Sequence, residues 1–170
     1  MNKNLLIIGA GQYGMLAKEI AEGMGAFEKI SFLDDNNTLA IGKIVEYERF
    51  VCDYSYAFVA IGNSEFRLEM MEKLQSVGFQ LAVLVGPNAY ISPSATIEEG
   101  CMIEPNATIL ANVKMEAGCF LSAGAVVNHN AIVERGCHID CNATVTARSV
   151  VKAKTKVGSG QAYNSEAIDV

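Results

Sequence analysis

The apolar positions of this chain change their period near residue 84. Before that point, short apolar runs alternate with stretches of helical character, and glycine or aspartate follows each of the first three runs. Strand, helix and strand in this order form βαβ units with a parallel sheet, and ligands bind at the carboxyl ends of such strands. We therefore expect a small Rossmann-like α/β domain over residues 1–84. The pattern predicts strands at residues 5–8, 30–33, 56–61 and 81–84, and helices at residues 15–24 and 64–76.

From residue 85 onward the apolar period becomes six. Thirteen of the fourteen positions taken at every sixth residue are aliphatic or Met, and the residue two positions earlier is almost always small. Neither a helix nor an ordinary sheet has this period. It predicts a three-sided prism of short parallel strands, in which three hexads make one coil and successive coils stack at about 4.8 Å. The positions are Val85, Ile91, Ile97, Ile103, Ile109, Met115, Leu121, Val127, Val133, Ile139, Val145, Val151, Val157 and Tyr163.

The register also places several polar side chains outside the inward columns. Glu98, Glu116 and Glu134 are each separated by one coil, and we expect a solvated acidic edge in which like charges raise the carboxyl pKa slightly. A catalytic role for these carboxylates is the alternative. The two histidines, His129 and His138, are outward as well. Because imidazole accepts a proton readily near neutral pH, the spacing alone leaves a pair of surface histidines and a shared catalytic site both open.

Three of the five cysteines, Cys101, Cys119 and Cys137, recur at intervals of one coil in the inward column of small residues. We expect their thiols to pack as small apolar groups, with a metal or redox role as the alternative. An odd number of cysteines favours free thiols in a reducing compartment over a disulfide framework. The apolar run at the N-terminus is too short for a signal peptide or a membrane span. Both observations predict a cytoplasmic protein with no membrane segment.

Composition narrows the class further. Apolar residues make up 51% of the chain and charged residues 19%, which is typical of a globular protein. Thirteen basic residues against nineteen acidic ones give a net charge of −6, and the densest basic stretch holds only three lysines. The phosphate backbone of a nucleic acid would therefore be repelled, and we expect no nucleic-acid partner.

The first apolar run ends in the loop Gly9-Ala10-Gly11-Gln12-Tyr13-Gly14. A Gly-x-Gly-x-x-Gly sequence after a strand often marks a dinucleotide site, but alone it is a weak signal. Residues 1–84 also provide only about half of a dinucleotide-binding fold. A tight turn from strand to helix with no ligand is the other interpretation of this loop.

As a whole, the chain resembles the hexapeptide-repeat sugar acetyltransferases, the left-handed β-helix enzymes that acetylate amino-sugar nucleotides or sialic acid. The most specific part of the resemblance is the pair of histidines, because the family places its catalytic and its donor-binding histidine at this spacing. The resemblance implies an α/β domain at residues 1–84 and a left-handed parallel β-helix at residues 85–170. The matching segments are the glycine loop, Phe32-Leu33-Asp34-Asp35, Ala60-Ile61-Gly62-Asn63 through Arg67, Ile91-Ser92-Pro93-Ser94-Ala95, Asn128-His129-Asn130 and Gly136-Cys137-His138.

The resemblance also implies a function. The family is trimeric with active sites between neighbouring subunits, so we expect a homotrimer that uses acetyl-CoA as co-substrate and holds no bound cofactor or metal. His129 would be the general base that deprotonates the acceptor amine or hydroxyl, and His138 would contact acetyl-CoA. The main-chain amide of Ala147 would stand where the family uses a glycine amide near the thioester carbonyl.

In the same family the N-terminal domain holds the acceptor, a sugar or nucleotide sugar. Gly11, Gln12 and Tyr13 match the loop beneath the sugar nucleotide. These motifs specify neither the acceptor sugar nor the choice between N- and O-acetylation. The other matching positions are Asp34, Asp35, Gly62 and Asn63.

Three features depart from the family pattern. Asn130 follows the catalytic histidine where the family usually has an acidic residue. An amide orients an imidazole but supplies no charge, which predicts a less basic His129. Ala147 adds a methyl group beside the thioester position. The hexad pattern decays at Gln161 and Tyr163, so we also expect either a helix that ends early or a shortened donor site.

Two other functions remain open. A non-catalytic trimer that only binds a nucleotide sugar would keep the glycine loop and the two aspartates, and it would tolerate loss of His129. A zinc hydratase of the same helical architecture would need three imidazoles that meet between subunits. Two histidines nine positions apart do not resemble its ligand set.

Overall fold

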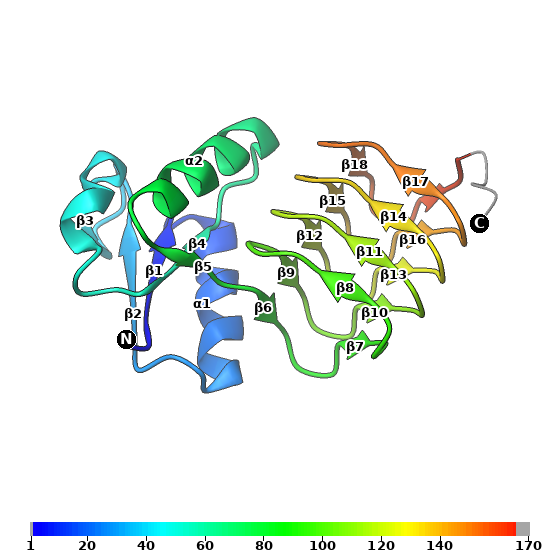
Figure 1. The fold of residues 1–170 in the computed structure, drawn as a ribbon, viewed down its shortest axis with the longest axis horizontal. Helices are drawn as coiled ribbons and strands as arrows, with labels where there is room; N and C mark the ends of the chain where they lie inside the picture. Colours follow the sequence, from blue (N-terminus) through cyan, green and yellow to red (C-terminus); the bar gives the residue numbers. More distant parts are fainter. Residues whose placement is uncertain (1, 166–170) are drawn as a thin grey trace. The chain divides into compact units, whose positions relative to one another are not determined.

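The computed structural model describes residues 2–165, and the end of the predicted second domain, residues 166–170, lies outside the described part. The chain divides into two compact units, Met1–Leu84 and Val85–Val170 (Figure 1). The first is an α/β unit with one sheet, and the second is built almost entirely from very short strands.

The N-terminal unit is a five-stranded parallel sheet with the order β3-β2-β1-β4-β5. The four apolar residues of β1 after Asn4 are fully buried, because this strand lies in the middle of the sheet. The expected helices and the first three expected strands are present. The strand expected at residues 81–84 is divided: β5 ends at Leu81, and Leu84 belongs to a strand of the second unit. The short strand β3 and the 3-10 helix after it were not predicted, because neither contains a buried residue. The elements are β1 (Asn4–Ile8), α1 (Gln12–Met24), β2 (Lys29–Leu33), β3 (Ala40–Gly42), η1 (Ile44–Phe50), β4 (Tyr56–Val59), α2 (Ser64–Ser76) and β5 (Gln80–Leu81).

The second unit is the predicted prism. Its strands form three parallel sheets, and each strand pairs with its counterparts one coil earlier and one coil later, as Thr108 does with Val126. The chain runs through the sheets in the order I, II, III. The helix continues to Tyr163, which pairs with Val145, although the sequence pattern weakens there. Sheet I contains β7 (Tyr90–Ile91), β10 (Thr108–Ile109), β13 (Val126–Val127), β16 (Thr144–Val145) and β19 (Ala162–Tyr163); sheet II contains β8 (Thr96–Ile97), β11 (Lys114–Met115), β14 (Ile132–Val133) and β17 (Val150–Val151); sheet III contains β6 (Leu84–Val85), β9 (Met102–Ile103), β12 (Phe120–Leu121), β15 (His138–Ile139) and β18 (Lys156–Val157).

Nearly every corner of the prism turns through a residue with a positive φ angle; the corner of Ser94 is the exception. The left-handed region suits glycine, which has no Cβ, and asparagine tolerates it better than most residues. This requirement explains why Asn and Gly recur at every sixth position along much of the helix. The positive-φ residues are Asn88, Gly100, Asn106, Asn112, Gly118, Gly124, Asn130, Gly136, Asn142, Arg148, Lys154 and Gly160.

The inward columns form the core of this unit. The stacked thiols of Cys101, Cys119 and Cys137 are buried, and each donates a weak hydrogen bond to a main-chain carbonyl 15 residues further along. Contacts between the neighbouring thiols, together with burial, raise the pKa of Cys119 and Cys137. The predicted packing of these thiols in one inward column is confirmed.

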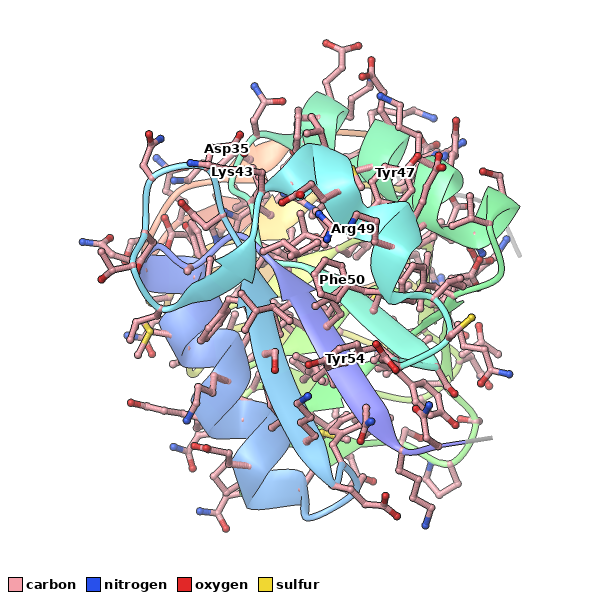
Figure 2. All side chains as sticks on the ribbon, turned by 90° about the vertical axis from the view of Figure 1, so that its left-hand side faces the viewer. Asp35, Lys43, Tyr47, Arg49, Phe50 and Tyr54 are labelled. Carbon is pink, nitrogen blue, oxygen red and sulfur yellow. The ribbon has the colours of Figure 1, made fainter. Side chains whose placement is uncertain are left out.

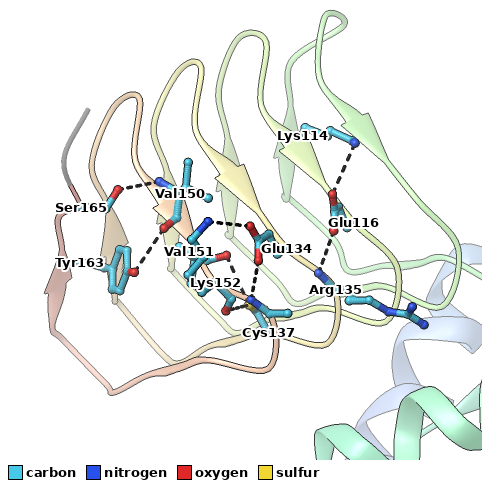
Figure 3. A network of polar contacts seen from close by, with 11 residues as sticks. Lys114, Glu116, Glu134, Arg135, Cys137, Val150, Val151, Lys152, Tyr163 and Ser165 are labelled. Atoms are coloured by element: carbon cyan, nitrogen blue, oxygen red, sulfur yellow. Dashed lines mark hydrogen bonds and ion pairs between the residues drawn. The ribbon is translucent and has the colours of Figure 1, made fainter. Parts of the chain in front are cut away.

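The outward glutamates bind the main chain of the next coil. The carboxylates of Glu98, Glu116 and Glu134 each accept the N–H of the residue 19 positions further along, at 2.8 to 3.1 Å. Figure 3 shows Glu116 and Glu134. The N–H of Ala153 and the ammonium of Lys152 lower the pKa of Glu134. The expectation that mutual repulsion raises the pKa is therefore wrong for Glu134, because it ignored the amides that lie between successive carboxylates.

Candidate functional site

His129 lies at the corner between sheets I and II, in the turn that joins β13 to β14, and its side chain is exposed. The side-chain amide nitrogen of Asn130 lies 3.0 Å from its Nδ1 atom. The Oδ1 atom of Asn130 accepts a hydrogen bond of 3.1 Å from the side-chain amide of Asn112, one coil earlier. The ring is therefore held through Nδ1, and Nε2 is left to face a ligand.

Local backbone geometry places Asn130 beside the ring. Asn130 has a φ of 60°, and its N–H donates to the Ala111 carbonyl at 2.9 Å. The His129 carbonyl in turn accepts from the Arg148 N–H at 3.1 Å. Ala147 follows His129 by one full coil, so it occupies the same place on the next coil. The structure thus brings three predicted site residues, His129, Asn130 and Ala147, to one corner.

The main-chain amides of this corner differ from those of the other two corners. At the corner after sheet II, successive carboxylates accept an N–H of the next coil, as Glu134 does from Ala153, and at the corner after sheet III one carboxylate, Glu104, accepts from Ala123. At the corner of His129 the matching positions are Leu110 and Asn128. Neither is a carboxylate, and the side-chain amide of Asn128 donates to the Val145 carbonyl. Within residues 2–165 the N–H of Ala147 has no acceptor.

His138 lies in β15 on sheet III, and only 6% of the residue is exposed. Its ring makes an edge-to-face contact with Phe120, and its Nε2 atom is 3.1 Å from the Ser122 hydroxyl. That hydroxyl donates to Glu104, whose pKa is raised by burial. The expectation of an exposed histidine is therefore wrong for His138, because the outward column of sheet III carries large apolar side chains that are themselves buried.

One chain does not bring the two histidines together. His129 lies at the corner between sheets I and II, and His138 lies on sheet III, the third face of the prism. In a triangular prism that corner and that face are on opposite sides. A site that uses both imidazoles needs two copies of the chain.

In the N-terminal unit, the predicted acceptor residues lie at the carboxyl ends of three neighbouring strands. The loops after β1, β2 and β4 meet at this edge, where the strand order reverses between β1 and β4. Tyr13 is half-buried, and its ring is so close to Gly62 that a Cβ there would lie 3.1 Å from it. The remaining glycine of the motif, Gly14, packs against the Gly9 carbonyl and leaves no room for a side chain. The other predicted residues of this edge, all exposed, are Gly11, Gln12, Asp35, Gly62 and Asn63.

Asp34 organises this edge through its carboxylate. The two oxygens accept from the N–H groups of Ala10, Asn36 and Asn37 at 2.8 to 2.9 Å, and the Asn37 amide donates to the Ala10 carbonyl at 2.7 Å. These amides, the Ala10 N–H foremost, lower the pKa of Asp34. Its carboxylate thus joins two loops around an open hollow of about 380 Å³.

Neighbouring residues fix the main chain of these loops through further hydrogen bonds. The Asp35 carboxylate accepts the Ile44 N–H at 3.1 Å, and the Asp35 carbonyl accepts from the Lys43 ammonium (Figure 2). Asn63 caps α2 by accepting the Phe66 N–H at 2.9 Å. The buried guanidinium of Arg67 donates to the Ile61 carbonyl at 2.6 Å.

Sequence reasoning missed several of these supporting residues. Asn112 precedes Asn130 by one coil, so the coil length was a signal that pointed to it. Ser122 lies 16 residues from His138 and had no such signal. Asn37 carried no signal, because its partner lies 27 residues away in another loop. Within residues 2–165 no group of three His, Cys, Asp or Glu side chains is arranged to hold a metal ion. None of the helices in that range is long and apolar enough to cross a membrane.

Part of the N-terminal unit matches a known protein family. Residues 4–74 match the family model described as the PglD N-terminal domain. A UDP-N-acetylbacillosamine N-acetyltransferase of Bacillus subtilis (strain 168) is 29% identical over 111 residues, which are 59% of this chain and 51% of that protein. The chain thus spans about half the length of this curated relative.

Solved structures cover more of the chain. The acetyltransferase domain of PglB from Neisseria gonorrhoeae FA1090, in complex with acetyl coenzyme A, matches with a TM-score of 0.90 and 28% identity, over 95% of this chain and 82% of that one. Perosamine N-acetyltransferase from Caulobacter crescentus, with CoA and GDP-perosamine, matches with a TM-score of 0.72 and 20% identity, over 96% and 90%. These findings confirm the resemblance to sugar acetyltransferases and the predicted fold class, an α/β unit followed by a left-handed parallel β-helix.

Because three main-chain amides donate to Asp34, we expect Asp34→Asn to lower the free energy of unfolding relative to the wild type, by an amount that depends on pH. The folded-state pKa of Asp34 is lowered, so its stabilisation is present above the unfolded value of about 3.9 and is lost as the pH falls through the folded value. Losing charge-assisted hydrogen bonds at a partly exposed site should cost about 1–2 kcal/mol at pH 7. Thermal unfolding from pH 7 to pH 3 measures it.

Asp35→Asn is the matched control, because the exposed carboxylate of Asp35 accepts only one main-chain N–H in the hydrogen bonds described here. We expect it to lower the melting temperature less than Asp34→Asn does. Equal melting temperatures for Asp34→Asn and the wild type at pH 7 would contradict the role of Asp34 in joining the two loops.

Proposed function

We propose that this chain is an acetyltransferase that moves an acetyl group from acetyl-CoA to an amino or hydroxyl group of a sugar or nucleotide sugar. The observation that carries the proposal is the match of 95% of the chain to the PglB acetyltransferase domain, whose structure contains acetyl coenzyme A. The corner of His129 supports it, because an exposed imidazole held at Nδ1 lies one coil from an N–H group that has no acceptor in the described chain.

In the proposed reaction the acceptor amine or hydroxyl attacks the carbonyl carbon of the thioester. His129 takes the proton of the nucleophile at Nε2, which requires that the Asn130 amide first turn its Oδ1 atom toward Nδ1, so that the ring proton lies on Nδ1. The N–H of Ala147 donates to the oxygen that becomes negative in the tetrahedral intermediate, and the alanine methyl does not remove that donor. The carbon–sulfur bond then breaks, and the CoA sulfur leaves with the proton from His129, which restores the neutral imidazole.

We place the active site between copies of the chain in a homotrimer. His129 and His138 lie on opposite sides of one prism, so a site in which His138 contacts the donor needs the corner of one copy and sheet III of another. The imidazole of His138 is held by Ser122, which is bonded to Glu104, and only 6% of the residue is left exposed to meet the donor.

The acceptor would bind at the N-terminal sheet edge, where Gly11, Gln12 and Tyr13 face Gly62 and Asn63. Because the Asp34 carboxylate accepts three main-chain N–H groups, we assign it to shaping this edge, and the hollow that it lines with Gly11 is where we place the acceptor. Rossmann-like sheets bind ligands at this edge.

A non-catalytic protein that binds a nucleotide sugar is the second candidate. It is favoured by the orientation of Asn130, which turns its amide nitrogen toward Nδ1 of His129 and so holds the ring proton on Nε2. Such a protein would bind the acceptor in the same way and would show no acetyl transfer.

His129→Ala should abolish acceptor-dependent release of thiol from acetyl-CoA, because removal of a general base lowers the rate by about 10²- to 10⁴-fold. The assay uses a panel of amino-sugar nucleotides and sugars with free amino or hydroxyl groups. Arg135→Ala is the matched control, since Arg135 is an exposed residue at the same place in the turn of another corner. Thiol release that does not depend on any acceptor, or full activity in His129→Ala, would contradict the proposal.

Asn130→Asp should increase the rate and move the limb of the pH–rate profile that reports the general base to higher pH. The carboxylate accepts the Nδ1 proton and stabilises the imidazolium, whereas the amide supplies no charge. Aspartate also tolerates the left-handed backbone of this turn. Asn142→Asp, at a φ of 55° on another corner, controls for added charge. An unchanged rate and an unmoved limb would show that Asn130 does not tune the base.

A further inference from the structure

We infer that Asn112 is a positioning residue for His129, because through Asn130 it decides which ring nitrogen carries the proton. This inference rests on the proposed role of His129 as general base. Asn112 lies one coil before Asn130 and does not touch the imidazole, so its effect passes entirely through the second amide.

The three side chains form a directed chain of hydrogen bonds. The Nδ2 group of Asn112 donates to Oδ1 of Asn130, and the Nδ2 group of Asn130 donates to Nδ1 of His129. A ring nitrogen that accepts a hydrogen bond carries no proton, so the neutral ring has its proton on Nε2. In that state Nε2 is a donor and cannot take a proton from the acceptor substrate.

Base catalysis therefore needs these two hydrogen bonds to run in the opposite direction, from His129 through Asn130 to position 112. If the Asn130 amide turns over, its Oδ1 atom accepts from Nδ1 of His129, and the lone pair of Nε2 becomes free. The Nδ2 group of Asn130 then points to position 112 and needs an acceptor there. Asn112 meets that need only by turning over as well, because each amide has one donor end and one acceptor end.

The backbone holds the two amides in reach of one another. Asn112 and Asn130 have φ angles of 57° and 60°, and the main chain of Asn112 is fixed by a hydrogen bond of 3.0 Å from its N–H to the Ser94 hydroxyl. The two side chains hydrogen-bond across one coil spacing at 3.1 Å. Turning an amide over exchanges donor and acceptor without moving the backbone.

Few charges compete with this arrangement. In the three turns that stack at this corner, residues 110–112, 128–130 and 146–148, the ionisable residues are His129 and Arg148. The N–H of Arg148 donates to the His129 carbonyl. No carboxylate is present in these turns to impose one tautomer, so the direction of the two amides decides it.

Asn112→Asp is the decisive variant, because a carboxylate at position 112 only accepts hydrogen bonds at neutral pH. It should turn Asn130 over and move the proton of neutral His129 from Nε2 to Nδ1, with a change of about fivefold or more in the tautomer ratio, the size expected from one net hydrogen bond. Imidazole ¹⁵N chemical shifts of the folded protein measure the ratio. With two histidines in the chain, His129→Ala assigns the signals.

Two further variants separate this effect from added charge and from loss of structure. Asn112→Gly keeps the left-handed turn and removes the amide, so the ratio should fall between those of the wild type and Asn112→Asp. Asn106→Asp adds the same charge at a φ of 59° on another corner, where no imidazole follows, and should leave the tautomer unchanged. One tautomer ratio shared by the wild type, Asn112→Asp and Asn112→Gly would overturn the inference.

Acetyl transfer provides a separate readout. If the tautomer shifts and Asn112→Asp also raises kcat without a matching change in KM, the inference and the proposed function both hold. If the tautomer shifts and no variant transfers acetyl groups, the proposed function fails while the positioning role of Asn112 stands. If acetyl transfer depends on His129 and the tautomer does not respond to position 112, the inference alone fails.

Discussion

The second unit depends on one constraint, that the chain turns a corner at every sixth position and returns to the same corner after three such turns. An aliphatic side chain must point inward on each face, and every corner from residue 100 to residue 160 is occupied by a residue with positive φ. This repeat brings residues one coil apart into contact. It therefore stacks the buried thiols and places Asn112 against Asn130 and His129 next to Ala147.

The distribution of main-chain amides distinguishes one corner from the others. At the corner after sheet II successive glutamate carboxylates accept the N–H of the following coil, which uses that donor and ties the coils together (Figure 3). At the corner after sheet III, Glu104 does the same. At the corner of His129, Leu110 and Asn128 stand where those carboxylates would be, and within residues 2–165 the Ala147 N–H has no acceptor. An unused donor beside an oriented imidazole is the arrangement that acyl transfer requires.

Most of the fold could be predicted from the sequence, because it depends on the spacing of the buried apolar residues. These recur at every sixth position in the β-helix, and in the N-terminal unit they form the alternating strands and helices. The burial of His138 could not be predicted, because the repeat shows that its side chain points outward but not which other side chains cover it. The hydrogen bonds of Asp34 and Asn37 were equally hidden, because they join loops that are 24 to 27 residues apart. At the candidate site the coil length pointed to Asn112, but the direction of its amide depends on side-chain geometry.

Because the two imidazoles lie on opposite sides of one prism, a site that uses both of them has to be shared between subunits. This requirement is tested most directly by coexpressing His129→Ala and His138→Ala chains with different affinity tags and isolating the mixed oligomers through both tags. In a cyclic trimer that contains both kinds of chain, one interface in three has an intact pair of histidines. We expect the mixed oligomers to recover about one third of wild-type acetyl transfer. Activity no higher than that of the two variants measured apart would contradict a site shared between subunits.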